Sequence, residues 1–217
     1  MTSARSHSAG PRTPKERREH WDDVHRTRSG NELSWWQSEP VLSLQLIVRY
    51  AHRDSRVVDV GGGTSYLSER LRGLGFRHLT VVDVSGAALR RAEARAPTSA
   101  PKIRWLRRDL TGGGHLGRFD VWHDRAVFHF LTRPEDREAY RRNVQRSLVP
   151  GGIAIVATFA PHGPSSCSGL PVRRYSPSTL SSAFGPAFTL KEFRREQHRT
   201  PWGTTQPFVY AVLSKSG

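Results

Sequence analysis

A short apolar segment that runs directly into three glycines constrains the fold of this chain most strongly. Residues 57–60 read Val-Val-Asp-Val, the glycines are Gly61, Gly62 and Gly63, and a helical segment is expected over residues 64–74. Glycine has no Cβ, so a strand that ends in glycines and turns into a helix brings backbone N–H groups close to a ligand. The pattern therefore predicts a strand–turn–helix unit with a ligand bound at the turn.

A second apolar strand ends in a carboxylate 24 residues after Asp59, the acid of the first strand. This second strand reads Val81-Val82-Asp83. The separation suits one strand–helix–strand unit, in which the second acid binds the ribose hydroxyl pair of a nucleoside cofactor. Asp83 is therefore a predicted cofactor residue, and the alternative is an acid that only caps the strand end.

The glycine spacing distinguishes two classes of cofactor. A dinucleotide site favours Gly-x-Gly-x-x-Gly, but Tyr66 occupies the third glycine position of that pattern. A carboxylate at Asp59 repels a pyrophosphate, whereas it favours a cofactor that carries a positive charge and an amino-acid tail. An NAD-dependent oxidoreductase is therefore a less favoured alternative, as is a tight turn whose glycines serve geometry alone.

Three motifs resemble those of the class I S-adenosylmethionine-dependent methyltransferases. Asp59-x-Gly61-x-Gly63-Thr64-Ser65 resembles motif I, Val82-Asp83-Val84-Ser85 resembles motif II, and residues 105–110 (Trp-Leu-Arg-Arg-Asp-Leu) resemble the third-strand motif. The resemblance covers roughly residues 20–213 and implies S-adenosylmethionine as the cofactor. It implies that Asp83 binds the ribose, and that Asp109 and the backbone of Leu110 bind the adenine. The cofactor residues that these motifs predict are Asp59, Gly61, Gly62, Gly63, Thr64, Ser65, Asp83, Val84, Ser85, Asp109 and Leu110.

A further segment resembles two groups within that family. Residues 119–126 (Phe-Asp-Val-Trp-His-Asp-Arg-Ala) are similar to thiopurine methyltransferases and to seven-strand protein-lysine methyltransferases, such as those that modify translation elongation factor and citrate synthase. Residues 20–25 and 34–36 resemble the N-terminal lid of the lysine enzymes. The chain departs from them at residues 127–131 (Val-Phe-His-Phe-Leu), where those enzymes commonly carry Gly-Thr-Leu-Asp-Ala and where the acceptor should lie. We therefore predict methylation of N, O or S on a small molecule, with a protein lysine side chain as the alternative.

Three polar residues follow the fourth expected strand, at the edge where ligands bind in parallel sheets. Methyl transfer is an in-line displacement, so the protein mainly aligns the reactants, and a neutral nitrogen acceptor benefits from a base or a carboxylate. Asp124 is predicted to orient the acceptor or the amino group of the cofactor, and His123 or His129 to act as the base. Either histidine can equally be a hydrogen-bonded packing residue.

Tryptophans in the N-terminal region are candidate lid residues. Trp21 and Trp36 are predicted to close over the cofactor, and the alternative is that they anchor an N-terminal helix to the core.

Charge and composition narrow the class of protein further. The net charge is +15, but only four of the 34 basic residues are lysines and the arginines are spread from end to end. A dedicated nucleic-acid face concentrates its basic residues, so a nucleic-acid partner is a less favoured alternative. The single cysteine, Cys167, excludes an intrachain disulfide and a cysteine-based metal cluster, and no metal is predicted. No apolar run approaches the ~20 residues that span a bilayer, so we expect a cytoplasmic location and no membrane contact.

Alternating strand and helix signals predict an α/β fold. We expect a Rossmann-like, doubly wound, mostly parallel seven-stranded sheet, with an antiparallel last strand and helices on both faces. One domain is expected over residues 15–217, after a disordered basic tail over residues 1–14; it divides into an N-terminal lid (15–52), a cofactor-binding core (53–159) and an acceptor loop with a C-terminal hairpin (160–217). Expected strands are 56–60, 79–83, 102–106, 119–123, 153–159, 189–197 and 206–213. Helices are expected over 40–50, with an apolar stripe of Val41, Leu44, Ile47 and Val48, over 86–95, from a capping box of Thr132 and Glu135 to 148, and over 178–183.

Overall fold

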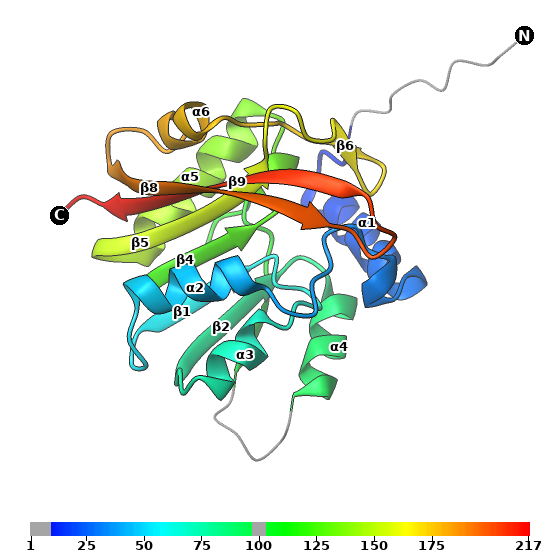
Figure 1. The fold of residues 1–217 in the computed structure, drawn as a ribbon, viewed down its shortest axis with the longest axis horizontal. Helices are drawn as coiled ribbons and strands as arrows, with labels where there is room; N and C mark the ends of the chain where they lie inside the picture. The colour runs from blue at the N-terminus through cyan, green and yellow to red at the C-terminus, as the bar shows by residue number, and fades with distance from the viewer. Residues whose placement is uncertain (1–9, 97–102) are drawn as a thin grey trace, which may run out of the picture.

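The computed structural model describes residues 10–96 and 103–217. Its centre is a seven-stranded sheet with the strand order β3-β2-β1-β4-β5-β9-β8 (Figure 1). The first five strands in this order run parallel, and β9 lies antiparallel between β5 and β8. This arrangement confirms the predicted doubly wound sheet with an antiparallel last strand beside the fifth. The strands are β1 (Arg56–Val60), β2 (His78–Asp83), β3 (Arg104–Arg107), β4 (Phe119–Arg125), β5 (Leu148–Phe159), β8 (Phe188–Arg199) and β9 (Thr205–Lys215).

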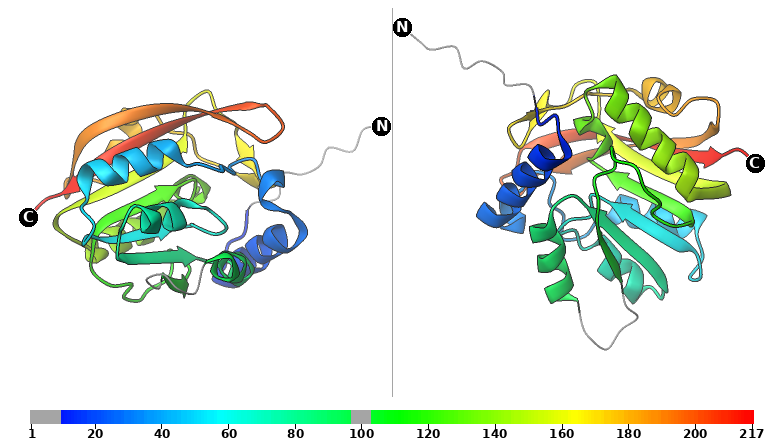
Figure 2. Two further views of the ribbon diagram at one scale, coloured as in Figure 1. Left: turned by 60° about the horizontal axis from the view of Figure 1, so that its bottom comes forward. Right: turned by 180° about the vertical axis from the view of Figure 1, so that it is seen from behind.

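Helices cover both faces of the sheet (Figure 2). Leu46, Leu71 and Leu89 of α2, α3 and α4 pack in one core cluster, whereas Val144 and Leu180 of α5 and α6 pack in the cluster on the opposite face. The helices are α1 (Pro14–Thr27), α2 (Val41–Tyr50), α3 (Leu67–Gly73), α4 (Gly86–Arg95), α5 (Pro134–Ser147) and α6 (Pro177–Ser182), with short 3-10 turns at Gly30–Glu32 and Phe128–Phe130.

Successive residues of each central strand point to opposite faces of the sheet. In β1, Val57 belongs to the cluster under α2 and α3, and Val58 belongs to the cluster under α5. In β4, Val121 and Trp122 divide in the same way. The alternation continues to the end of β4, so His123 points toward α2 and Asp124 points toward α5.

Helix α1 lies at the edge of the sheet where the parallel strands end. It starts with a capping box, in which Thr13 and Glu16 each bond the backbone of the other and Pro14 takes the first helical position. Thr13 and Pro14 therefore belong to α1 and not to the predicted tail, of which residues 1–9 lie outside the described residues. The carboxylate of Asp22 accepts hydrogen bonds from Ser85 Oγ at 2.8 Å and from Ala87 N at 3.0 Å. Asp22 thus joins α1 to the first turn of α4.

The start of two helices differs from the sequence prediction. The predicted Thr132–Glu135 capping box is wrong, because Pro134 keeps Arg133 extended and makes it the N-cap, without a side-chain cap bond. Glu135 instead accepts hydrogen bonds from the guanidinium of Arg133. Helix α3 begins at Leu67, three residues later than expected, because the glycine turn extends through Ser65.

Two further segments also depart from expectation. The expected acceptor loop, at the start of segment 160–217, contains the small hairpin β6 (Ser166–Cys167) and β7 (Leu170–Pro171). The predicted apolar stripe of α2 is rotated: Ser43, Leu46 and Ile47 form its buried face.

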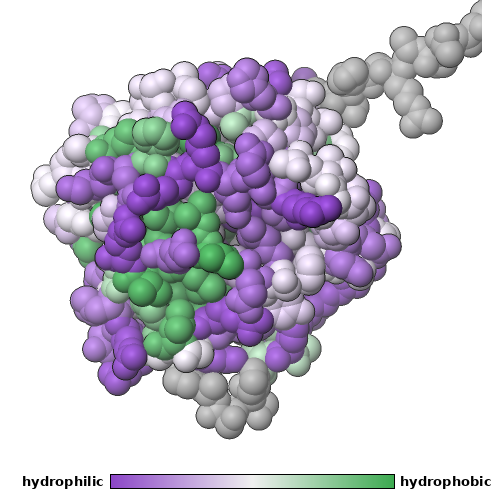
Figure 3. Space-filling view, viewed as in Figure 1, coloured by the Kyte–Doolittle hydropathy of each residue, from purple (hydrophilic) through white to green (hydrophobic). Residues whose placement is uncertain are grey.

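The outer side of α2 contributes to an exposed apolar area that Figure 3 shows on this face of the molecule. Val41 and Val48 of α2 are 53% and 49% exposed. Neither residue lines the cavity described below. Among the described residues, no helix is long and apolar enough to span a membrane.

Candidate active site

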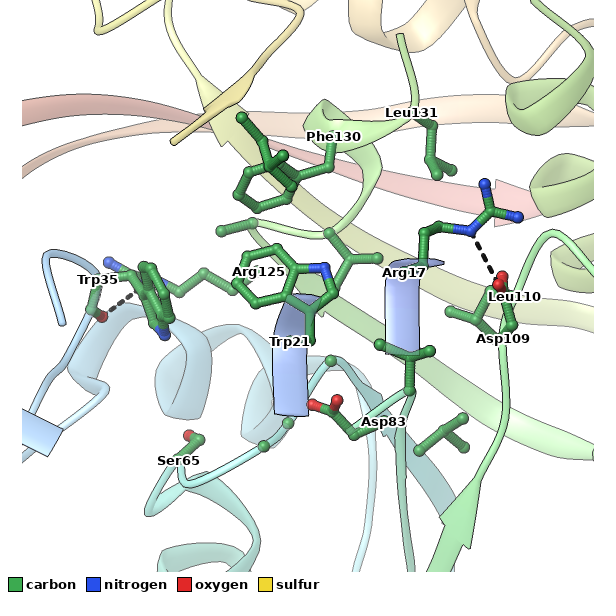
Figure 4. Close-up of a pocket in the computed structure, with 18 of the residues that line it drawn as sticks. Arg17, Trp21, Trp35, Ser65, Asp83, Asp109, Leu110, Arg125, Phe130 and Leu131 are labelled. Carbon is green, nitrogen blue, oxygen red and sulfur yellow. Dashed lines mark hydrogen bonds and ion pairs between the residues drawn. The ribbon is translucent and has the colours of Figure 1, made fainter. Parts of the chain in front are cut away.

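A cavity of about 560 Å³ lies at the carboxyl ends of the central strands (Figure 4). Its volume falls within the ~300–1,000 Å³ that is typical of small-ligand sites. The glycine turn and the ends of β2 and β4 form one side, and residues of α1, the following loop and the β6–β7 hairpin form the other. Of the predicted cofactor residues, the cavity is lined by Asp59, Gly61, Gly62, Gly63, Thr64, Ser65, Asp83, Val84, Asp109, Leu110, Trp21 and Trp36.

Close packing around the turn requires glycine at these positions. Gly61 has a φ of 65° and Gly63 a φ of 45°, a backbone region that favours glycine. A Cβ on Gly61 would lie 2.0 Å from Val127 Cγ2, and a Cβ on Gly62 would lie 2.7 Å from Asp59 Oδ2. The turn therefore presents bare backbone to the cavity, as a cofactor cradle requires.

The carboxylate of Asp83 lies beneath this turn and is buried. It accepts backbone hydrogen bonds from Ser85 at 2.8 Å and from Gly63 and Val84. Burial raises the pKa of Asp83 to about 7, and the nearby negative charge of Asp59 adds to the effect. No lysine or arginine of the described residues lies within 4.0 Å of this carboxylate. Its remaining lone pairs suit the hydroxyl donors of a ribose.

Asp109, the expected adenine acid, is joined to α1. It accepts hydrogen bonds from Arg17 Nε at 2.8 Å and from the backbone of Thr111 at 2.9 Å. Burial opposes ionisation of Asp109, but the hydrogen bonds from Arg17 and Thr111 outweigh it and hold the pKa below its ordinary value. Figure 4 shows Arg17 and Asp109 facing one another at the side of the cavity where Leu110 also lies.

His123 lines the cavity as part of a buried hydrogen-bonded chain. Its Nδ1 lies 2.7 Å from Asp59 Oδ1, and its Nε2 lies 2.9 Å from Ser43 Oγ. Both ring nitrogens are therefore already paired with protein groups. The structure brings the predicted base into the cavity wall, but a ligand meets it through Ser43 or Asp59.

Asp124 does not line the cavity, contrary to the expectation that it orients a reactant there. Its oxygens accept hydrogen bonds from Val127 N at 2.9 Å, from Phe128 N at 3.1 Å and from the hydroxyl of Tyr140. Burial raises the pKa of Asp124 to about 6, against the lowering effect of these hydrogen bonds. The alternation of β4 turns this side chain toward α5, where it holds the loop after the strand.

His129 likewise lies outside the cavity lining. It is fully buried against Phe130 and Phe159, with ring centroids 4.5 Å and 4.7 Å away. Its Nδ1 lies 3.4 Å from the backbone N of Phe159, and burial lowers its pKa to about 3. The structure therefore places this predicted base in the hydrophobic core, because the 3-10 turn of residues 128–130 directs its side chain away from the cavity.

The predicted lid residues lie over the cavity. The indole of Trp21 stands between Asp83 and Phe130 in Figure 4. It packs edge-on against Phe130 and Trp35, with ring centroids 4.9 Å and 5.8 Å away. Ser85, predicted as a cofactor residue, is buried outside the lining, where its hydroxyl donates to Asp22 and caps α4.

Sequence reasoning missed several cavity residues. Arg125 Nη1 donates to the carbonyl of Trp35 at 2.9 Å, and its Nε donates to the Tyr210 hydroxyl at 3.0 Å. Its ion pair with Glu196, at 3.4 Å, completes this set of contacts. In a chain with so many arginines, neither Arg125 nor Arg17 stands out. Ser43 carried a sequence signal for this part of the site, because it is a polar residue within a mostly apolar helix.

Comparisons with known proteins agree with this geometry. The model of a family described as "Methyltransferase domain" matches residues 57–152. A curated relative from Danio rerio, an eEF1A lysine and N-terminal methyltransferase, is 28% identical over 156 residues, which are 69% of this chain and 22% of the relative. Its Drosophila melanogaster homolog is 26% identical over 151 residues, covering 65% and 22%. The chain thus spans about a fifth of the length of these relatives.

Solved structures share the fold over nearly the whole chain. The 1,6-didemethyltoxoflavin-N1-methyltransferase of Burkholderia thailandensis, with S-adenosylhomocysteine bound, has a TM-score of 0.73 at 17% identity and covers 97% of this chain and 93% of its own. The N-methyltransferase NodS of Bradyrhizobium japonicum, in complex with S-adenosylhomocysteine, has a TM-score of 0.68 at 17% identity and covers 90% and 98%. A structure from work on the conversion of a disulfide bond into a thioacetal group during echinomycin biosynthesis reaches 0.75 at 19% identity, covering 92% and 93%.

The sheet order, the glycine turn and the buried acid after β2 define an α/β domain with a cavity at the carboxyl edge of its sheet, where ligands bind in folds of this kind. The match to the methyltransferase domain narrows the class of protein further. Residues 57–152 match the methyltransferase domain family, and the chain has the Rossmann-like fold of the class I S-adenosylmethionine-dependent methyltransferases.

Proposed function

We propose that this chain is a class I methyltransferase with S-adenosylmethionine as its cofactor, and that it methylates a nucleophilic N, O or S atom of a small molecule. The observation that carries the proposal is the cover over the cavity. Helix α1 and the β6–β7 hairpin both contribute lining residues, and the segment before α1 lies against the hairpin, since a Cβ on Gly10 would lie 3.5 Å from Pro171 Cδ. A cavity covered in this way suits an acceptor that is taken up whole.

The residues present fit the cofactor, and we propose their roles from the geometry. S-adenosylmethionine supplies an electrophilic methyl carbon. Asp83 accepts hydrogen bonds from the ribose hydroxyls, Asp109 accepts from the adenine amine, and the glycine turn admits the amino-acid tail without a steric clash. The cover of α1 excludes water, and alignment of the reactants in such a site supplies on the order of 7–11 kcal/mol toward the barrier.

The acceptor side of the cavity is apolar. Val127, Phe130 and Leu131 line it, from the segment where the chain departs from the lysine enzymes. Arg125, which also lines the cavity, uses three of its nitrogens on Trp35, Tyr210 and Glu196. This wall favours a largely apolar acceptor that presents one nucleophilic atom.

A protein side chain is the second candidate, because the curated relatives carry names that state lysine and N-terminal methylation. The aromatic rings of Trp21, Trp35 and Phe130 could also enclose the stem of a lysine. A protein acceptor would have to reach the cavity past α1.

Labelled methyl transfer tests both candidates. The enzyme is incubated with S-adenosylmethionine carrying an isotope-labelled methyl group and with a lysate separated into small-molecule, protein and nucleic-acid fractions. We expect label in the small-molecule fraction and none with Asp83→Ala, which loses the ribose acceptor. Label on lysine residues of the protein fraction would overturn the small-molecule acceptor in favour of the second candidate, and label on nucleic acid would overturn both.

We also propose that the enzyme works in the cytoplasm. Its only cysteine, Cys167, is a buried free thiol, so the fold does not depend on an oxidising compartment. Localisation of the tagged full-length chain in its source cells checks this.

A further inference from the structure

Three buried side chains form a continuous hydrogen-bonded chain that reaches the cavity. Asp59 at the end of β1 lies 2.7 Å from His123 Nδ1, and His123 Nε2 lies 2.9 Å from Ser43 Oγ on the first turn of α2. The three residues are 5%, 2% and 1% exposed, and all three line the cavity. Protons that move along this chain are therefore exchanged with the cavity and not with bulk solvent.

The chemistry of the three groups fixes the direction of the hydrogen bonds. An ionised carboxylate only accepts, so Nδ1 of His123 carries a proton and donates it to Asp59. In the neutral imidazole, Nε2 is then the acceptor, and the hydroxyl of Ser43 donates to it. Ser43 accepts no hydrogen bond from another described residue, so the lone pairs of its oxygen are available to a donor in the cavity.

The position of this chain in the sheet places it beside the reaction centre. Asp109 follows β3 and Asp83 ends β2, so the adenine and ribose sites come first in the strand order. If Asp109 and Asp83 held the adenine and the ribose, the rest of an adenosyl cofactor would extend toward β1 and β4, where Asp59 and His123 pair across neighbouring strands.

We propose that Ser43, His123 and Asp59 form a proton relay that removes the proton of the bound acceptor during methyl transfer. The inference rests on the proposed function, since it requires an acceptor that arrives protonated. Ser43 is the catalytic residue because its hydroxyl meets the acceptor, whereas His123 and Asp59 act through it. The arrangement explains how a histidine with both nitrogens paired serves as a base.

The proton and electron balance of the step is complete. The acceptor atom forms a bond to the methyl carbon while the bond from that carbon to sulfur breaks, and the electron pair of the broken bond stays on sulfur. The acceptor proton passes to Ser43 Oγ as the proton of Ser43 passes to His123 Nε2. The resulting imidazolium is stabilised by Asp59, and after the product leaves its extra proton passes back through Ser43 to water that enters the cavity.

Other charged groups surround the relay and bear on its titration. Asp124 of β4 interacts electrostatically with His123 from the far side of the sheet. Next to Ser43 lies the phenol of Tyr210 on β9, which donates to Glu196 at 2.9 Å and accepts from Arg125. The phenol proton of Tyr210 is thus committed to Glu196, so Tyr210 can only accept from the nearby hydroxyl of Ser43, which lies 2.9 Å from His123 Nε2.

Three variants and a matched control test the relay, with the small-molecule fraction that supports label transfer as the source of acceptor. Ser43→Ala and His123→Gln are each expected to lower kcat about 10²-fold or more, the usual contribution of a general base. Ser43→Thr keeps the hydroxyl and is expected to restore most of the rate. Ser68→Ala removes another buried helical serine, outside the cavity lining and without a side-chain hydrogen bond to a described residue, and should leave kcat unchanged.

Two readouts separate a proton relay from a structural or binding role. The rise of kcat with pH on the acidic side of the kcat–pH profile should disappear in Ser43→Ala, and calorimetry should show S-adenosylhomocysteine binding close to that of the parent enzyme. An unchanged pH profile, or a loss confined to cofactor affinity with kcat intact, would overturn the relay. Failure of the parent enzyme to label any small molecule would instead refute the proposed function, so the two failures are distinguishable.

Discussion

Protonation of Asp83 is expected to weaken cofactor binding below about pH 7. Burial raises the pKa of this carboxyl to about 7, so it titrates within the physiological range. The ionised form is the better acceptor for the ribose hydroxyls, and it alone gives charge attraction to a sulfonium. If only that form binds, the Kd rises about tenfold between pH 8 and pH 6, which corresponds to about 1.4 kcal/mol.

The titration of Asp83 affects folding stability with the opposite sign to its effect on cofactor binding. The folded-state pKa of Asp83 lies above its ordinary value of 3.8, so its contribution to stability is fully present below about pH 4 and is lost as pH rises through about 7. At the pH where the cofactor is expected to bind best, the buried, ionised carboxylate of Asp83 therefore lowers the stability of the free enzyme, which is a form of electrostatic strain. Hydroxyl donors of the ribose relieve that strain, which couples cofactor binding to folding.

Calorimetry with S-adenosylhomocysteine at pH 6, 7 and 8 measures the predicted change in Kd. The control is Asp83→Asn, which keeps an acceptor oxygen but does not titrate; its Kd should be higher at pH 8 and nearly constant across the range. Asp83→Asn retains Asp124, whose pKa is raised to about 6, so a pH dependence that the variant shares with the parent enzyme would be assigned to Asp124. A parent Kd that stays flat from pH 8 to pH 6 would refute the reasoning.

Three further substitutions have defined outcomes. In Gly61→Ala the turn holds the alanine at a left-handed φ, and its Cβ clashes with Val127. We therefore expect a loss of at least about 1–2 kcal/mol in the free energy of unfolding measured with urea, together with weaker binding of S-adenosylhomocysteine. Tyr140→Phe removes the hydroxyl that donates to Asp124, and should cost about 1–3 kcal/mol of unfolding free energy; an unchanged urea midpoint would contradict this. Arg17→Ala frees α1 from Asp109, so limited proteolysis should cut near α1 faster, and equal cleavage rates would show that this contact does not hold the lid.

The cofactor side of the site could be predicted from sequence because its constraints are local. A glycine that must adopt a positive φ, as Gly61 and Gly63 do, leaves a direct mark on the sequence. The spacing from Asp59 to Asp83 is set by one strand–helix–strand unit, and the structure places both acids in the cavity lining. Fold class followed from the same alternation of strands and helices.

The acceptor side could not be predicted in the same way, because its residues meet only through tertiary packing. Arg125 reaches Trp35 across 90 positions, and His123 reaches Ser43 across 80. For α2, the apolar stripe predicted from periodicity turned Val41 and Val48 inward, but the tertiary fold buries Ser43 with Leu46 and Ile47 instead. A rotation of one helix by about one residue position thus hid the polar group nearest the reaction centre.

The roles of neighbouring residues on β4 follow from this dependence on tertiary packing. His123 and Asp124 are adjacent in the sequence and both polar, so sequence alone favoured the acid as the residue that meets the ligand. The alternation of the strand sends them to opposite faces, where His123 joins Asp59 and Ser43 while Asp124 bonds the backbone at Val127 and Phe128. Because the same loop carries Val127 into the cavity and packs it against the glycine turn, Asp124 shapes the acceptor wall from beneath. The titratable acid of the pair thus sets the geometry of the site, and the histidine provides its path for protons.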